Sequence, residues 1–177
     1  MTRQPIPRPV ANTYWVEEPH FLAGEYPGAL HAADIPARLT RFLDAGILTF
    51  FDLTTPADKM TPYAGHLSDL GRERGLDVRR VSVPIPDLGL PSSRTRMTLI
   101  LEEIDVELSR GRGVYVHCWG GVGRTGTVVG CWLAERAGSG DQALLQLAEL
   151  WHTVEKFPRK PRSPETAAQR AYVRAWV

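Results

Sequence analysis

The stretch GVYVHCWGGVGRTGTVVG (113–130) decides the fold of this chain. Its first six residues, GVYVHC, are mostly apolar and predict a buried central strand. The residues RTGTVVGCWLAERAG (124–138) predict a helix that is apolar over most of its surface and is therefore buried. A glycine-rich loop joins the two. The stretch thus predicts a strand, a tight loop and a helix, with Cys118 where the strand ends and Arg124 where the helix begins.

Strands and helices alternate along the rest of the chain. The periodicity of apolar residues and the positions of glycine and proline predict a strand pair at 13–28, strands at 47–53 and 77–85, and helices at 34–46, 61–75, 92–111, 141–151 and 163–176. The helix at 61–75 should begin with Thr61 as its N-cap and Pro62 in its first turn. This alternation is typical of an α/β sandwich in which helices flank a mainly parallel central sheet.

Length and composition indicate one globular domain. The chain has 177 residues, of which 43% are hydrophobic and 23% are charged. This length is enough for one domain with a sizeable core and is tight for two. We therefore expect a single domain over residues 1–177 and, because the first residues are rich in proline, a flexible segment at 1–12.

The charge balance and the cysteine count exclude several classes of protein. With 21 basic and 20 acidic side chains, the chain has no global field that would attract nucleic acid or a membrane. The locally basic segment KFPRKPR (156–162) is expected to be a solvated loop. No stretch is long and apolar enough to span a bilayer or to act as a signal peptide, and two cysteines do not make a disulfide framework. We therefore expect a cytoplasmic protein whose cysteines are free to react.

Two nucleotide-binding patterns overlap the glycine-rich loop, and neither fits. Gly121, Gly123 and Gly126 spell G-x-G-x-x-G, but no strand carrying an acidic residue follows the helix, as a dinucleotide-binding fold requires. An ATP-binding loop would need glycine at position 118 and lysine at position 124, where this chain has cysteine and arginine. The remaining alternative is structural, with Cys118 as a small core residue beside a tight turn.

The spacing within the loop argues against that alternative. HCWGGVGRT (117–125) reads H-C-x5-R-T in a strand–loop–helix setting, which resembles the signature of the cysteine-dependent protein tyrosine phosphatase superfamily. In its small size the chain resembles members of the dual-specificity branch of that superfamily. Together with PIPDLGLPS (84–92), the loop is similar to the subgroup of the cyclin-dependent-kinase-associated phosphatase. The resemblance covers roughly residues 20–176 and implies a protein tyrosine phosphatase-like fold.

The loop residues suit a phosphate group for physical reasons as well. A loop that leads into a helix N-terminus aims successive backbone N–H groups at an anion. Glycines permit unusual backbone angles and keep side chains away from the phosphate, and a guanidinium can bind two phosphoryl oxygens at once. We therefore expect the phosphate-binding residues to be Trp119, Gly120, Gly121, Val122, Gly123 and Arg124.

The same surroundings favour a thiolate nucleophile at Cys118. His117 should order the loop through hydrogen bonds to backbone carbonyls, a role that differs little from that of an ordinary core histidine. Thr125 should donate its hydroxyl to the Cys118 sulfur and ease departure of the thiolate; the alternative is that this hydroxyl only caps the helix.

A thiolate that displaces an alkoxide or phenoxide requires a general acid, because the leaving oxygen needs a proton. The strands at 77–85 and 113–117 are predicted to be parallel, which places their carboxyl ends at one edge of the sheet. The loop after the first of these strands holds one carboxylate, Asp87, and the resembled family has its general acid in a loop of this kind. Asp52 is the weaker candidate, because its DLTTP context is typical of a turn-capping aspartate.

SPETAAQRAY (163–172) partly resembles the glutamine loop of the larger phosphatases, which orients the hydrolytic water. Gln169 matches the second glutamine of that loop, but Glu165 stands where the first would be. A water-positioning role for Gln169 therefore competes with a plain helix start capped by Ser163.

The sequence thus predicts a phosphomonoester hydrolase that forms a phosphocysteine intermediate and needs no metal or other cofactor. The expected substrate is phosphotyrosine, and possible further substrates are phosphoserine and phosphothreonine, in a protein or peptide. Phosphate and vanadate are expected inhibitors. Two alternatives stay open: a phosphoinositide, inositol-phosphate or nucleotide phosphatase with the same chemistry, and a phosphoprotein-binding module that does not hydrolyse its ligand.

Overall fold

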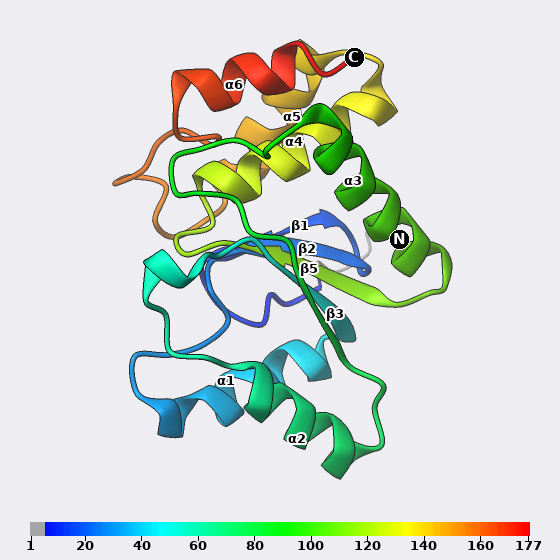
Figure 1. Cartoon of the computed structure of the whole chain (residues 1–177), viewed down its shortest axis with the longest axis vertical. Helices are drawn as coiled ribbons and strands as arrows, with labels where there is room; N and C mark the ends of the chain where they lie inside the picture. The colour runs from blue at the N-terminus through cyan, green and yellow to red at the C-terminus, as the bar shows by residue number, and fades with distance from the viewer. Residues whose placement is uncertain (1–5) are drawn as a thin grey trace.

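The computed structural model describes residues 6–177 and shows a five-stranded sheet with helices on both faces (Figure 1). The strands are β1 (Thr13–Glu17), β2 (Phe21–Gly24), β3 (Ile47–Asp52), β4 (Arg79–Ser82) and β5 (Gly113–His117). They lie in the order β1-β2-β5-β3-β4. β1 pairs antiparallel with β2, whereas the other neighbours in the sheet are parallel. The predicted α/β sandwich with a mainly parallel sheet is confirmed.

Helices of different parts of the chain cover the two faces of the sheet (Figure 1). One face carries α1 (Ile35–Asp44) and α2 (Ala64–Arg74). The other carries α3 (Arg94–Ser109), α4 (Gly123–Ala137), α5 (Gly140–His152) and α6 (Ala167–Arg174). Two short 3-10 turns, η1 (Ala32–Asp34) and η2 (Pro56–Asp58), connect elements. Each face of the sheet has its own hydrophobic core.

β5 and α4 form the centre of the molecule. Along β5 the side chains alternate, so that Val114 and Val116 join the core beneath α3–α6 while Tyr115 joins the core beneath α1 and α2. Residues 123–134 of α4 are all buried, because the helix packs against α3, α5 and α6 as well as the sheet. The loop between β5 and α4 is therefore held at the middle of the sheet edge.

The second helix begins later than the sequence predicts. α2 starts at Ala64, and Tyr63 precedes it as a buried residue of the core. The predicted cap, Thr61, lies outside the helix, and its carbonyl accepts a hydrogen bond from the Tyr26 hydroxyl at 3.0 Å. Packing of an aromatic side chain has thus overridden the local cap signal.

The amino-terminal segment is tied to the body of the domain. Arg8 Nη1 donates to the carbonyls of Thr13 and Thr153, each at 2.9 Å. Trp15 Nε1 donates to the carbonyl of Ile6 at 3.1 Å. These contacts involve part of the segment expected to be flexible, and residues 1–5 of that segment lie outside the described residues. Within residues 6–177, the helices are too short or too polar to cross a bilayer.

Candidate active site

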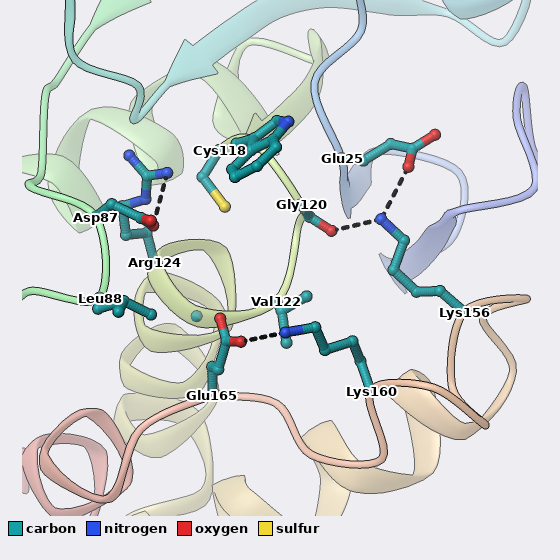
Figure 2. Close-up of a pocket in the computed structure, with 12 residues that line it drawn as sticks. Glu25, Asp87, Leu88, Cys118, Gly120, Val122, Arg124, Lys156, Lys160 and Glu165 are labelled. Atoms are coloured by element: carbon teal, nitrogen blue, oxygen red, sulfur yellow. Dashed lines mark hydrogen bonds and ion pairs between the residues drawn. The ribbon is translucent and has the colours of Figure 1, made fainter. Parts of the chain in front are cut away.

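A cavity of about 440 Å³ lies at the edge of the sheet where β5 ends (Figure 2). Four separate segments of the chain line it, contributing Glu25, Asp87, Leu88, Cys118, Trp119, Gly120, Val122, Gly123, Arg124, Lys156, Lys160 and Glu165. Cys118 is only 3% exposed, and Figure 2 shows its sulfur pointing into the space between the Asp87–Arg124 pair and the loop. The structure therefore brings the predicted nucleophile, the predicted arginine and the predicted acid to one cavity.

The loop after Cys118 turns its carbonyl groups outward. Three of these carbonyls accept hydrogen bonds from outside the loop: Trp119 O from Tyr26 N at 2.9 Å, Gly120 O from Lys156 Nζ at 2.8 Å, and Val122 O from Ser163 Oγ at 2.8 Å. In a trans peptide unit the N–H points opposite to the C=O. The N–H groups of the three following residues therefore face away from these donors, as an anion-binding loop at a helix N-terminus requires.

The glycines of the loop differ in how strictly the structure requires them. Gly121 has a φ of +73°, and a Cβ there would lie 2.4 Å from the carbonyl carbon of Gly24. At Gly123 a Cβ would lie 2.8 Å from Gln169 Oε1. A Cβ at Gly120 would meet its nearest neighbour, Val122 Cγ2, at an ordinary 3.6 Å. The backbone thus demands glycine at position 121, whereas Gly120 is not among the glycines with a positive φ.

Arg124 is buried in the first turn of α4 and is held by carboxylates. Its Nη1 and Nη2 donate to the two oxygens of Asp58 at 2.9 and 2.8 Å, and Nη1 also donates to the carbonyl of Ile85 at 3.2 Å. Nη2 lies 3.0 Å from Asp87 Oδ1. The predicted acid therefore touches the predicted phosphate-binding arginine, and Asp87 is 54% exposed while Arg124 is 2% exposed.

Asp58 was not found from the sequence. It is the last residue of η2, in the segment that connects β3 to α2, and its side chain is 3% exposed. The hydrogen bonds from Arg124 lower the pKa of Asp58 from 3.8 to about 2, so the carboxylate stays ionised beside the guanidinium. A signal was available, because β3 is parallel to β5 and every loop that follows such a strand reaches the same edge of the sheet.

His117 lies behind the loop as a neutral side chain. Its Nε2 lies 2.8 Å from the Tyr63 hydroxyl, and its Nδ1 lies 3.4 Å from the carbonyl of Cys118. Burial lowers the pKa of His117 to about 4. The predicted contact with a loop carbonyl is present but long, and the shorter contact to Tyr63 fixes the position of the ring.

Asp52 caps a turn, as its sequence context predicts. Its Oδ1 accepts hydrogen bonds from the backbone N–H and the hydroxyl of Thr54, at 2.9 and 2.6 Å. Its Oδ2 accepts a hydrogen bond from Arg80 Nε at 2.9 Å. Asp52 does not line the cavity that contains Cys118, whereas Asp87 does. This placement favours Asp87 over Asp52 as the candidate acid.

Thr125 does not make its expected contact. Its hydroxyl oxygen is buried and has no hydrogen-bond partner among residues 6–177. The predicted bond from this hydroxyl to the Cys118 sulfur is therefore not formed in this structure. The hydroxyl of the next threonine, Thr127, donates to the carbonyl of Gly123 at 2.8 Å and continues the pattern of bonded carbonyls.

Gln169 is buried and links α6 to the Asp87 loop. Its Nε2 donates to the carbonyl of Gly89 at 3.0 Å, while its Oε1 accepts a hydrogen bond from the Thr166 N–H at 3.1 Å. Thr166 in turn caps α6 by accepting a hydrogen bond from the Gln169 N–H, so Ser163 is not the helix cap. Gln169 does not line the cavity, and its contacts indicate a part in holding the loop that carries Asp87.

The basic segment at 156–162 is not simply a solvated loop. The Lys156 side chain is only 16% exposed and reaches the loop between Cys118 and Arg124. Lys160 lines the cavity and forms an ion pair with Glu165 at 2.6 Å. Trp119 is 58% exposed at the rim of the same cavity. The place of these two lysines at the cavity was not predicted from the sequence, because only tertiary packing brings them to the loop.

Across residues 6–177, no group of three or more histidine, cysteine, aspartate or glutamate side chains is arranged to hold a metal ion. The polar groups at the cavity are instead two ion-paired lysines, an arginine, carboxylates and backbone amides. Such a set can bind an oxyanion and move a proton beside a thiol.

Comparison of the sequence with known proteins identifies relatives. The model of a family described as "Polymorphic toxin system, DSP-PTPase phosphatase" matches residues 29–138, which is more than half of the chain. Protein 067L of Invertebrate iridescent virus 3, named as a candidate tyrosine phosphatase, is 30% identical over 112 residues, or 62% of this chain and 43% of the viral protein. The chain spans less than half the length of the curated relatives that it matches.

Solved structures with the same fold include several phosphatases. Tk-PTP in its active form has a TM-score of 0.70 and 22% identity, covering 93% of this chain and 95% of that one. Kinase associated phosphatase, KAP, has a TM-score of 0.67 and 22% identity, with coverage of 86% and 83%. PTPMT1 in complex with PI(5)P has a TM-score of 0.69 and 15% identity, with coverage of 93% and 94%. At such identities the likeness shows the fold, and with the match of the family model it follows that this chain belongs to the DSP-PTPase phosphatase family.

Proposed function

We propose that this chain hydrolyses phosphotyrosine in proteins or peptides through a phosphocysteine intermediate, with Cys118 as the nucleophile. The observation that carries the proposal is that Cys118, Arg124 and Asp87 line the same cavity. Beside them, the carbonyls of the loop accept hydrogen bonds from outside the loop, which leaves its N–H groups free for an anion. A thiol, a buried guanidinium and an exposed carboxylate are the groups that a phosphoryl transfer to sulfur needs.

In the first step the Cys118 thiolate attacks phosphorus while the ester P–O bond breaks. Loop N–H groups and Arg124 hold the three phosphoryl oxygens, and the negative charge that builds up on them is balanced by the guanidinium and the amides. Asp58 occupies Nη1 and Nη2 of Arg124 from one side, and Asp87 touches Nη2. Within residues 6–177, Arg124 Nε makes no hydrogen bond, so the Nε–H remains available to a phosphoryl oxygen.

Asp87 donates its proton to the leaving oxygen. In this structure the Asp87 carboxylate lies 3.0 Å from Arg124 Nη2. A bound phosphoryl group would compete for the same nitrogen and so release Asp87 to face the leaving oxygen. The Asp87 side chain is 54% exposed, so neighbouring side chains do not prevent the carboxylate from turning toward the leaving oxygen.

In the second step a water molecule attacks phosphorus and the S–P bond breaks. Asp87, now ionised, takes a proton from that water, and Cys118 leaves as a thiolate with release of inorganic phosphate. The enzyme returns to its starting state with no metal or redox step.

Turnover of p-nitrophenyl phosphate tests the proposal. Wild-type protein should release nitrophenol, and Cys118→Ser should abolish turnover while vanadate still binds, because the anion is held by backbone amides and Arg124. Rapid acid quench of a reaction with a ³²P-labelled phosphotyrosine peptide should trap label on Cys118 of the wild-type chain. Substantial activity in the serine variant would refute the assignment of the nucleophile.

A phosphoinositide or inositol phosphate is the second candidate substrate. Lys156 and Lys160 line the cavity and could attract further phosphates, and PTPMT1 of the same fold was solved with PI(5)P. Both lysines are already paired with glutamates, at 2.9 and 2.6 Å, so the rim adds no net positive charge. The phosphotyrosine peptide should therefore exceed inositol hexakisphosphate in kcat/KM by at least about tenfold. The reverse order would favour the second candidate and leave the chemistry of Cys118 unchanged.

A further inference from the structure

The peptide unit between Gly120 and Gly121 is fixed from two sides. Its carbonyl oxygen, on Gly120, accepts a hydrogen bond from Lys156 Nζ at 2.8 Å. Its nitrogen belongs to Gly121, which has a φ of +73° and packs so closely on the end of β2 that a Cβ would lie 2.4 Å from Gly24. A side chain 36 residues further along the chain thus sets the direction of one loop amide.

Lys156 differs from the other groups that hold the loop. Trp119 O and Val122 O accept hydrogen bonds from a neutral amide and a neutral hydroxyl, respectively, whereas Gly120 O accepts one from an ammonium group. Hydrogen bonds with a charged partner are roughly twice as strong as neutral ones. A cation bound to the C=O end of a peptide unit also polarises the unit and makes its N–H a better donor.

The lysine is itself held in place. Its Nζ lies 2.9 Å from Glu25 Oε2, and Glu25 also pairs with Arg38 at 2.7 Å. The backbone N–H of Lys156 donates to Asn12 Oδ1 at 3.2 Å. Figure 2 shows Lys156 spanning from its own segment to Gly120 and Glu25 at the side of the cavity. The Lys156 side chain is 16% exposed and its ammonium group is bonded to both Glu25 and Gly120, so it has little freedom to follow a ligand.

We propose that Lys156 is a positioning residue of the phosphate-binding loop, which orients and polarises the Gly121 N–H toward the phosphoryl oxygens. The inference rests on the proposed function, since it assigns that N–H to the phosphate site. Lys156 acts through the peptide unit and does not itself bind the substrate.

Lys156→Met removes the ammonium and keeps most of the aliphatic stem, and Lys160→Met is its matched control. Lys160 lies on the same segment and lines the same cavity, but its ammonium group donates to Glu165 and not to the phosphate-binding loop. Deleting a donor from an oxyanion site costs roughly 10²–10³-fold in rate. Lys156→Met keeps the Gly121 N–H but no longer fixes its orientation, so the loss should be smaller than that. We expect kcat/KM for p-nitrophenyl phosphate to fall about tenfold and the vanadate inhibition constant to rise by a similar factor.

The control separates the bond from simple charge. If Lys156 acts through Gly120, Lys160→Met should change both quantities by much less than Lys156→Met does. Equal losses in the two variants would show that only the net charge of the cavity matters and would overturn the proposal. Wild-type values in Lys156→Met would overturn it too, as would a loss confined to substrates with a second anionic group.

Two further measurements keep the outcome interpretable. Circular dichroism and thermal unfolding establish that Lys156→Met is folded, and Lys156→Gln carries the same test should the methionine variant not fold. Lys156→Arg, which restores a cationic donor, should recover most of the vanadate affinity. Failure of the proposed function has a different signature: no turnover by wild-type protein, or turnover by Cys118→Ser, whatever the vanadate affinity of the Lys156 variants.

Discussion

Replacing Asp58 by asparagine removes the negative charge that lies against both terminal nitrogens of Arg124 and keeps the size of the side chain. The pair is almost fully buried, at 3% and 2% exposure. In the folded protein the pKa of Asp58 is about 2, compared with 3.8 for an ordinary aspartate. Each unit of difference between the folded and unfolded pKa is worth about 1.4 kcal/mol. The ionised Asp58 carboxylate therefore contributes about 2.5 kcal/mol to the free energy of unfolding.

The sign of the pH dependence follows from the lowered pKa. The contribution of Asp58 is fully present above the unfolded value of 3.8 and is lost as the pH falls toward about 2. At neutral pH, Asp58→Asn should therefore be about 2.5 kcal/mol less stable than wild type, which for a chain of this size lowers Tm by about 5–10 °C. Between pH 4 and pH 2 the stability gap between variant and wild type should narrow.

Urea unfolding at several pH values and steady-state kinetics measure both consequences. Because Asp58 fixes the guanidinium of Arg124, kcat/KM should also fall, by about tenfold. Asp44→Asn is the matched control, since Asp44 pairs with Arg74 at 2.6 Å but is 57% exposed. That exposed pair should contribute less than about 1 kcal/mol. An Asp58→Asn variant with the stability, pH dependence and kcat/KM of wild type would refute the argument.

Three other outcomes are expected. Asp87→Asn should slow turnover by roughly 10²–10⁴-fold and flatten the basic limb of the pH–rate profile, and a normal basic limb would place the acid elsewhere. Gly121→Ala should abolish vanadate binding while Gly120→Ala keeps most of it, since a Cβ meets backbone at 2.4 Å in the first case and a methyl group at 3.6 Å in the second. Burial raises the pKa of Cys131, so peroxide should oxidise Cys118 without a bridge between the two cysteines, and mass spectrometry detecting that bridge would contradict this.

The sequence was sufficient where local pattern and sheet geometry act together. An apolar strand, a glycine loop and an apolar helix could be read directly, and they position Cys118 and Arg124. Asp87 could be placed because β4 and β5 run in the same direction in the sheet, so that the loops after them reach the same edge. That argument required no knowledge of side-chain packing.

The remaining contacts depend on tertiary structure. Asp58 belongs to a loop at the same edge, yet nothing in its spacing distinguishes it from the other polar residues nearby. Lys156 lies in a basic segment whose composition is that of a solvated loop, and only the packing after α5 carries it to Gly120. Thr61 had the local signature of a cap, but burial of Tyr63 moved the helix start.

The donors that hold the loop carbonyls have a consequence for how the protein is made. Two of them, Lys156 and Ser163, lie well beyond Arg124 in the sequence, and the segment matched by the family model ends at residue 138. A chain leaves the ribosome amino-terminal end first, and a domain folds as a unit only when its parts are available. The cysteine and arginine therefore leave the ribosome before the groups that shape their anion site. Oxyanion affinity should appear only when the segment after α5 has docked on the loop, so vanadate binding reports completion of folding. A fragment that stops at residue 138 should contain Cys118 and Arg124 but lack the oriented loop that binds phosphate and activates the thiol.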